Sequence, residues 1–320
     1  MISALLLGAV AWGHALEPSL LELDARDPAR VQVTWKRPFA EGSPLPLDVL
    51  LPPGCAATGP VTVDESTTVR TERWTADCGA AFSGQLSVLG LERTGGDVIF
   101  RYQDSEQRHH AVLTPAAPSW SRPQGAASGS PSALRLYLPI GVEHILEGAD
   151  HLAFVLGLVL LVGRRARALL LAITGFTLAH SLTLALASLD VVRAPSAVVE
   201  ACIAGSVLLL AVELARPADA PPTWTHRHPA LVSMACGLLH GLGFAGALAE
   251  LGLPQDDLLG ALLGFNLGVE AGQLTVVAGL LALGAAARAL RLTAQRPLVY
   301  ALGAVAAMWT LARGWAVLIG

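Results

Sequence analysis

The chain has 320 residues, of which 53% are hydrophobic and 14% are charged, and its formal net charge at neutral pH is -4. This composition excludes most soluble enzymes and is typical of a membrane protein. The small net charge, together with the absence of any Lys/Arg run interleaved with aromatic residues, predicts that no nucleic acid is a partner.

The first fifteen residues, MISALLLGAVAWGHA, resemble a secretory signal, because an apolar stretch is followed by the small-x-small sequence Gly13-His14-Ala15. We predict that residues 1–15 form a signal peptide that is cleaved after Ala15. The segment has no Lys or Arg near its start, so a short uncleaved anchor is the alternative.

Residues 16–115 consist of short runs with alternating polarity, such as VQVTW and DVIFRYQ, separated by turns rich in Gly and Pro. Period-2 runs at this spacing predict a small β-sandwich-like domain outside the cytoplasm. The adjacent pair His109-His110 lies in one of these runs, and we interpret both side chains as surface residues. The following stretch, residues 116–135, is rich in Ala, Ser, Pro and Gly and is typical of a linker.

The four cysteines divide between the two parts of the chain. Cys55 and Cys78 lie in the N-terminal domain, and export to an oxidising compartment favours a disulfide between them over two free thiols. Cys202 and Cys236 lie in apolar segments, in no metal-binding spacing, and we expect them to be small buried apolar residues.

Residues 136–320 predict an all-α membrane bundle, because they divide into six apolar segments that are each long enough to cross about 30 Å of bilayer. We place these segments at about 138–162, 167–188, 195–215, 229–250, 257–286 and 297–318. Arginines gather in the loops after the first, third and fifth segments, so the positive-inside rule predicts that the N-terminal domain and the carboxyl terminus are extracytoplasmic. We therefore expect a multi-pass protein of the cell (inner) membrane.

Polar residues interrupt the first apolar segment in a regular pattern. His144, Glu147 and His151 share one face of a helix, since they are three and seven residues apart. Asp150 adjoins this face, and it either binds an ion directly or orients an imidazole through its second ring nitrogen. Each ionisable group costs about 2.5–3.5 kcal/mol in a membrane, so we expect these residues to face inward and to hold a metal ion.

Later apolar segments add further polar residues, and one group in the fifth segment repeats the helical spacing of the first. The candidate metal ligands are His144, Glu147, Asp150, His151, His180, Glu200, His240 and Glu270, and the supporting polar residues are Thr177, Ser181, Asn266 and Gln273. Imidazoles and carboxylates without thiolates suit a divalent transition metal such as nickel, cobalt, zinc or iron.

Several motifs in this half of the chain resemble those of the HupE/UreJ family of hydrogenase and urease accessory membrane proteins, in the branch with an exported N-terminal domain. The motifs are HILEGADH (144–151), TGFTLAHSLTL (174–184), VVEA (198–201), LLHGLGFAG (238–246) and GFNLGVEAGQL (264–274). The family is regarded as nickel permeases or metal-uptake accessories. The resemblance therefore implies that His144, Asp150 and His151 belong to a metal pathway, and it favours nickel as the ion.

The motifs and the resemblance together predict a divalent-metal uptake permease that contacts lipid, its metal ion and metalloenzyme-maturation partners. Two alternatives stay open, an intramembrane metal-dependent hydrolase and a metal-sensing or accessory protein. We expect a transporter or accessory rather than an enzyme, although the inner half of the predicted spans is poor in polar residues, which favours the alternatives.

Overall fold

The structure is a computed structural model that describes residues 18–40, 42–66, 69–79, 82, 84–122, 132–189, 191–217, 219–251, 257–290 and 295–319. The predicted signal peptide, much of the predicted linker and Gly320 lie outside these ranges. The chain divides into a β-rich unit, Leu16–Leu136 together with Glu250–Gly260, and a helical unit that contains Tyr137–Ala249 and Ala261–Gly320. The expected division into a β-rich domain followed by a helical membrane region is confirmed.

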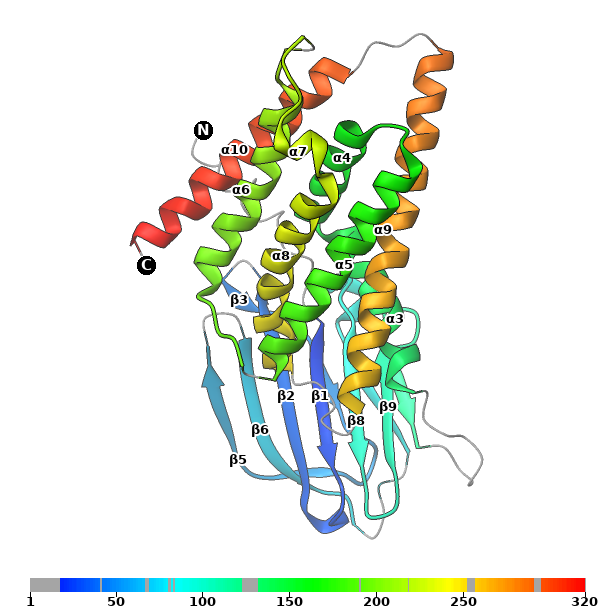
Figure 1. Ribbon diagram of the computed structural model, residues 1–320. Helices are drawn as coiled ribbons and strands as arrows, with labels where there is room; N and C mark the ends of the chain where they lie inside the picture. The colour runs from blue at the N-terminus through cyan, green and yellow to red at the C-terminus, as the bar shows by residue number, and fades with distance from the viewer. Residues whose placement is uncertain are drawn as a thin grey trace. The chain divides into compact units, whose positions relative to one another are not determined.

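The β-rich unit contains two sheets (Figure 1). The strands of the larger sheet are β1 (Ser19–Asp24), β2 (Val31–Ala40), β3 (Ser43–Pro44), β5 (Ala56–Glu65), β6 (Val69–Asp77), β8 (Val98–Gln103) and β9 (Arg108–Leu113). Their order is β5-β6-β2-β1-β8-β9, with β3 paired to β2, and every pair is antiparallel except β1 with β8. The smaller sheet has the order β10-β7-β4 and contains β4 (Asp48–Leu50), β7 (Gln85–Leu89) and β10 (Ser119–Ser121). Two short helical turns complete the unit, η2 (Pro28–Arg30) and α2 (Leu91–Thr94).

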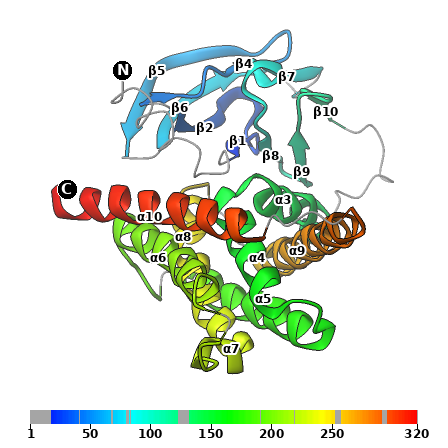
Figure 2. The same cartoon turned by 90° about the horizontal axis from the view of Figure 1, so that it is seen from above.

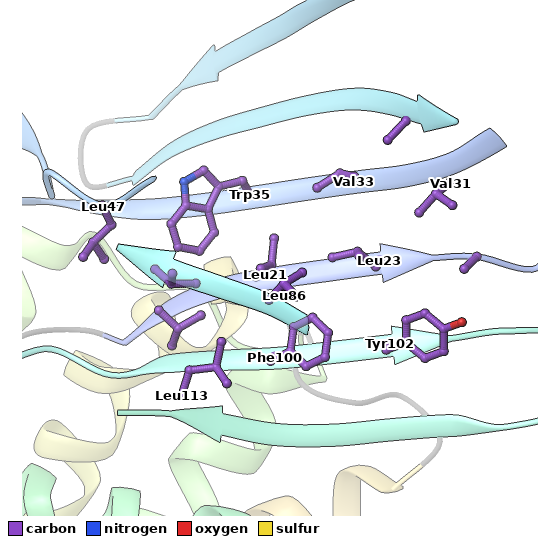
Figure 3. Packing of buried hydrophobic residues seen from close by; sticks show 14 of the residues in the cluster. Leu21, Leu23, Val31, Val33, Trp35, Leu47, Leu86, Phe100, Tyr102 and Leu113 are labelled. Atoms are coloured by element: carbon purple, nitrogen blue, oxygen red, sulfur yellow. The ribbon is translucent and has the colours of Figure 1, made fainter. Parts of the chain in front are cut away.

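Alternating burial along the strands forms one hydrophobic core that both sheets share. Val31, Val33 and Trp35 of β2 are buried, and the residues between them are more exposed. Figure 3 shows Leu86, from the smaller sheet, lying among core side chains of the larger sheet, near Phe100. The period-2 pattern in the sequence thus corresponds in β2 to a real strand with one buried face, whereas every residue of β5 is exposed.

A disulfide bond joins Cys55 and Cys78 at the edge of this core, with an S–S distance of 2.04 Å. The predicted pairing is therefore confirmed. Of the other two cysteines, Cys236 is buried as expected, but Cys202 is exposed in the structure, so that expectation was wrong.

The interpretation of His109 as a surface residue was also wrong. Its side chain is buried, with its ring centroid 6.0 Å from that of Tyr102 and 5.7 Å from that of Trp120. Trp120 belongs to β10, a strand that lies inside the range assigned to the linker and pairs with β7. This strand is hard to recognise in the sequence, because it lies in a short run rich in Ser and Pro and because Trp120 supplies most of its apolar surface.

Among the described residues, the helical unit contains seven longer helices and one short one, which Figure 2 shows from above. They are α3 (Ala133–Glu147), α4 (Ala149–Val162), α5 (Ala166–Ser188), α6 (Ser196–Leu214), α7 (Trp224–Arg227), α8 (Pro229–Leu251), α9 (Leu258–Ala289) and α10 (Gln295–Ile319). Within the described residues, α5, α6, α9 and α10 are long and apolar enough to cross a membrane, and α3 with α4 would make a fifth span if counted as one. The described apolar part of α8, Pro229–Phe244, is shorter. Six spans therefore remain a prediction.

The first predicted span is not one straight helix. It is broken at Gly148, where α3 and α4 meet at an angle of 72°. Gly148 has an extended backbone conformation (φ -70°, ψ 98°), which lies outside the helical region. The polar residues in this segment were interpreted as one face of a continuous helix, so the break was not expected.

Glycines allow two pairs of helices to approach closely. A Cβ atom at Gly141 of α3 would collide with the carbonyl oxygen of Phe265 in α9, and one at Gly268 of α9 would collide with that of Leu138 in α3. Gly237 and Gly241 of α8 face the backbone of α5 in the same way. Small residues at helix crossings are typical of packing within membranes. These contacts bring α3, α5, α8 and α9 together around a set of buried histidines.

Candidate metal centre

Three buried histidines from three different helices lie within reach of one another. His144 lies in the last turn of α3, His151 lies in the first turn of α4, and His180 lies in α5. One ring nitrogen of each falls within 4.8 Å of the others. Nitrogen ligands sit about 2.0–2.1 Å from a zinc-like ion, which puts ligands of a tetrahedral site about 3.4 Å apart. Small ring rotations would therefore close this set around one ion.

The break at Gly148 is what brings His144 and His151 together. On a straight helix, residues seven apart are separated by about 10 Å along the axis. Here the two ring centroids are only 4.6 Å apart, because the chain turns between them. The predicted stripe thus contains the two imidazoles that the structure brings together, but the break, and not a shared helix face, brings them there.

A fourth buried imidazole, His240 of α8, adjoins this group. Its Nδ1 atom lies 3.4 Å from Nε2 of His151, a distance suited to two ligands of one ion. The two ring centroids are 4.8 Å apart, and His240 is 1% exposed. The structure therefore collects four of the predicted histidines in one place.

Asp150 determines which nitrogen of His151 carries the proton. Its Oδ1 atom accepts the backbone N–H of His151 at 2.9 Å and lies 3.1 Å from the His151 Nδ1 atom. A carboxylate oxygen can only accept, so Nδ1 donates and Nε2 keeps its lone pair. Of the two roles predicted for Asp150, this geometry matches the orienting one.

Ser206 of α6 has the corresponding effect on His240. Its hydroxyl donates to the carbonyl oxygen of Ile203 at 2.7 Å, which uses its only proton. In the tautomer of His240 in which the Ser206 oxygen accepts from Nε2, 3.4 Å away, Nδ1 of His240 keeps its lone pair and faces that of His151, and a cation between them would relieve their repulsion. In the other tautomer, Nδ1 of His240 donates to Nε2 of His151 at 3.4 Å.

Asn266 of α9 orients His180. The Asn266 amide donates to the carbonyl oxygen of Leu262 at 2.8 Å, so its own carbonyl oxygen faces Nδ1 of His180 at 3.3 Å. Nδ1 therefore donates, and Nε2 of His180 retains a lone pair that is buried and has no hydrogen-bond partner among the described residues. Such buried polar atoms call for an explanation, and an ion that is bound when the site is loaded provides one.

His144 is buried, and within the described chain neither of its ring nitrogens has a hydrogen-bond partner. Its ring lies against aromatic side chains instead, with centroid distances of 4.2 Å to Phe244 and 5.3 Å to Phe265. Phe176 packs on His151, His180 and His240. These phenylalanines keep water from the imidazoles, which strengthens any electrostatic interaction at the site.

The three predicted glutamates lie apart from the group of three histidines. Glu147 is exposed at the end of α3, although it was predicted to share the face of His144. Glu200 accepts a hydrogen bond from Ser196 at 2.9 Å, and Glu270 accepts one from Thr174 at 2.7 Å. A ligand role for any of them stays a prediction that would require a movement of the side chain.

The supporting polar residues form contacts between and within helices. Thr177 of α5 donates to Gln273 of α9 at 3.1 Å, and Ser181 donates to the backbone carbonyl of Thr177 at 2.7 Å. Gln273 and Thr177 are both buried. Asn266 is thus the one residue of the four for which the structure gives a direct contact with a clustered histidine.

Three residues that bear on the site were not selected from the sequence. Gly148 places the break, Ser206 orients His240, and Arg313 of α10 lies 3.9 Å from Asp150. An arginine inside an apolar helix is costly, so Arg313 carried a usable signal. Its cost points to a buried acid as its partner.

Comparison with known proteins gives the chain a family. A family model described as HupE / UreJ protein matches residues 123–318, and no curated protein matches the sequence. Because the match covers more than half of the chain, the protein belongs to the HupE/UreJ family. The family and the apolar helices identify a membrane protein with a role in metal handling.

Proposed function

We propose that this HupE/UreJ family member is a permease that takes up a divalent transition metal, with nickel as the favoured ion and cobalt, zinc or iron as the other candidates. One observation carries the proposal: one ring nitrogen each of His144, His151 and His180 lie within 4.8 Å of one another, and the hydrogen bonds to Nδ1 of His151 and of His180 leave Nε2 of both rings without a proton. Neutral imidazole nitrogens of this kind are ligands for borderline divalent ions.

The broken first span supports transport over permanent binding. Discontinuous helices place ion sites near the middle of the membrane in many transporters, where parts of the bundle move against each other. At Gly148 the break adjoins both His144 and His151. A change in the angle between α3 and α4 would separate these two ligands and release the ion.

The proposal includes the predicted topology. We place six spans in the inner membrane, with a cleaved signal peptide and with both the β-rich unit and the carboxyl terminus outside the cytoplasm. Arg164, Arg165 and Arg167 follow the first span, as the positive-inside rule requires for this orientation. The partners would be lipid, the metal ion and proteins that mature a metalloenzyme.

A metal-dependent hydrolase is the second candidate, favoured by the group of three histidines, because three protein ligands and one open position are typical of catalytic zinc. Such an enzyme also needs a general base near the ion. Among the described acids of the helical unit, Asp150 bonds to His151, Glu200 to Ser196 and Glu270 to Thr174. This arrangement favours transport of the ion over catalysis. The experiment described next separates transport from a metal-sensing or accessory role.

The test is to reconstitute the full chain in lipid vesicles and to offer nickel, cobalt, zinc and iron in turn. We expect one or more of these ions to enter the vesicles, and His151→Ala to abolish this movement. His228→Ala is the matched control, because His228 is exposed next to α7. Binding without movement of any ion would reject the permease and support a sensor or accessory role.

A further inference from the structure

Arg313 of α10 lies beside the candidate metal centre without any assigned role. Its side chain is 11% exposed, and that of its neighbour Asp150 is 12% exposed. A charged side chain buried within an apolar helix is costly unless it is paired. The position of Arg313 therefore calls for a reason beyond helix packing.

The guanidinium of Arg313 is held next to Asp150 but is not fully engaged with it. Nη1 lies 3.9 Å from Asp150 Oδ2, which is within ion-pair range and too long for a hydrogen bond. The same Nη1 donates to the backbone carbonyl of Glu200 at 3.4 Å, and the guanidinium lies 5.7 Å from the centre of the Trp309 ring. Contacts with α6 and α10 thus fix the arginine at a set distance from the acid.

The two carboxylate oxygens of Asp150 have different partners, a histidine and an arginine. Oδ1 holds His151, whereas Oδ2 faces Arg313. With neutral imidazoles, the empty site then has one negative and one positive charge, which cancel. A bound divalent ion adds two positive charges in surroundings of low dielectric constant, where charges interact strongly.

We infer that Arg313 is a built-in counter-cation, which neutralises Asp150 in the empty site and repels the bound metal, so that affinity stays low enough for release. The inference rests on the proposed function, since it assumes that the histidines hold a metal. It assigns Arg313 a positioning role that tunes the site without touching the ion.

A purely structural role makes the opposite prediction. If Arg313 only anchored α10 to α4 and α6, its removal would loosen the site and weaken metal binding. If it opposes the metal, removal tightens binding even though the ion pair is lost. The sign of the change in affinity therefore separates the two roles.

The experiment measures binding of nickel and zinc to the purified full chain by calorimetry, and loss of the ion by stopped-flow with a chelator. We expect Arg313→Gln to bind at least about tenfold more tightly and to release the ion more slowly. Arg313→Lys should resemble the wild type, since it keeps the charge. Arg296→Gln is the control, because Arg296 lies on the same helix and is exposed.

The Arg313→Gln protein could fail to fold, because the substitution removes the positive charge beside Asp150. A second pair of variants covers that case. Asp150→Asn should weaken binding, and adding Arg313→Gln to it should raise the affinity again. Equal or weaker binding upon removal of Arg313 in both backgrounds would overturn the inference. Absence of metal binding by the wild type would instead reject the proposed function.

Discussion

The substitution Gly148→Ala tests whether the helix break at this residue positions the histidines for metal binding. A Cβ atom at this position would lie 2.6 Å from Nδ1 of His151 and 2.8 Å from the carbonyl oxygen of His144. The backbone angles of Gly148 are accessible to alanine. The substitution therefore acts through its contacts with the His151 imidazole and the His144 carbonyl oxygen, both of which must shift, and not through unfavourable backbone angles at residue 148.

The size of the effect follows from this contact. Ordinary van der Waals separation begins near 3.4 Å, so the His151 ring must retreat by about 0.8 Å. The hydrogen bond from Nδ1 to Asp150, now 3.1 Å, would then exceed the range of a hydrogen bond. A hydrogen bond to a charged group contributes about 1.5–3 kcal/mol, which corresponds to a loss of metal affinity of roughly 10- to 150-fold.

Calorimetric titration of the purified full chain with nickel measures this loss. Gly205→Ala is the matched control, since Gly205 lies within α6 and a Cβ atom there would meet nothing within 4 Å. The control should bind nickel as the wild type does and should gain up to about 1 kcal/mol of stability, as replacement of a helical glycine does. Equal affinities of the Gly148→Ala and Gly205→Ala proteins would refute this account of the break.

Two predictions concern the β-rich unit. Replacing both Cys55 and Cys78 by alanine opens a loop with a sequence separation of 23 and should reduce the stability of the unit by about 3 kcal/mol, whereas Cys202→Ser should not; thermal unfolding in oxidising buffer measures the difference. Burial lowers the pKa of His109 below its usual 6.5, against an opposing effect of Asp104. Because the unfolded chain then binds a proton at a higher pH than the folded chain, stability is complete above about pH 6.5 and declines as the pH falls below it. His109→Phe should flatten this decline between pH 7 and pH 5, and an unchanged slope in near-UV circular dichroism melts would show that other groups cause it.

The elements that follow simple periodicity could be predicted from the sequence. The first residues of β2 alternate between buried and more exposed side chains, and the long apolar runs of α5 and α6 are helices. The break at Gly148 could not be predicted, because one glycine in an apolar run occurs in many straight membrane helices. β10 escaped notice since its three residues are too few to show a period.

Within the site, the sequence predicted the residues better than their roles. Costly imidazoles in apolar segments pointed to His180 and His240 without any structure, and both are buried in the cluster. The positions of the carboxylates were harder to predict. An acid near a helix end can be exposed, as Glu147 is, and an acid within a helix can accept a hydrogen bond from a neighbouring hydroxyl, as Glu270 does. Their orientation depends on rotations between helices that spacing along one helix does not determine.

The close crossing of α3 and α9 has a consequence for how the protein is made. Gly141 seats against Phe265 and Gly268, residues that leave the ribosome more than 120 positions later. Until that late segment enters the bilayer, α3 lacks its close crossing with α9, and the His144 ring lacks its contact with Phe265. The surroundings of the candidate metal centre are therefore completed only near the end of biogenesis.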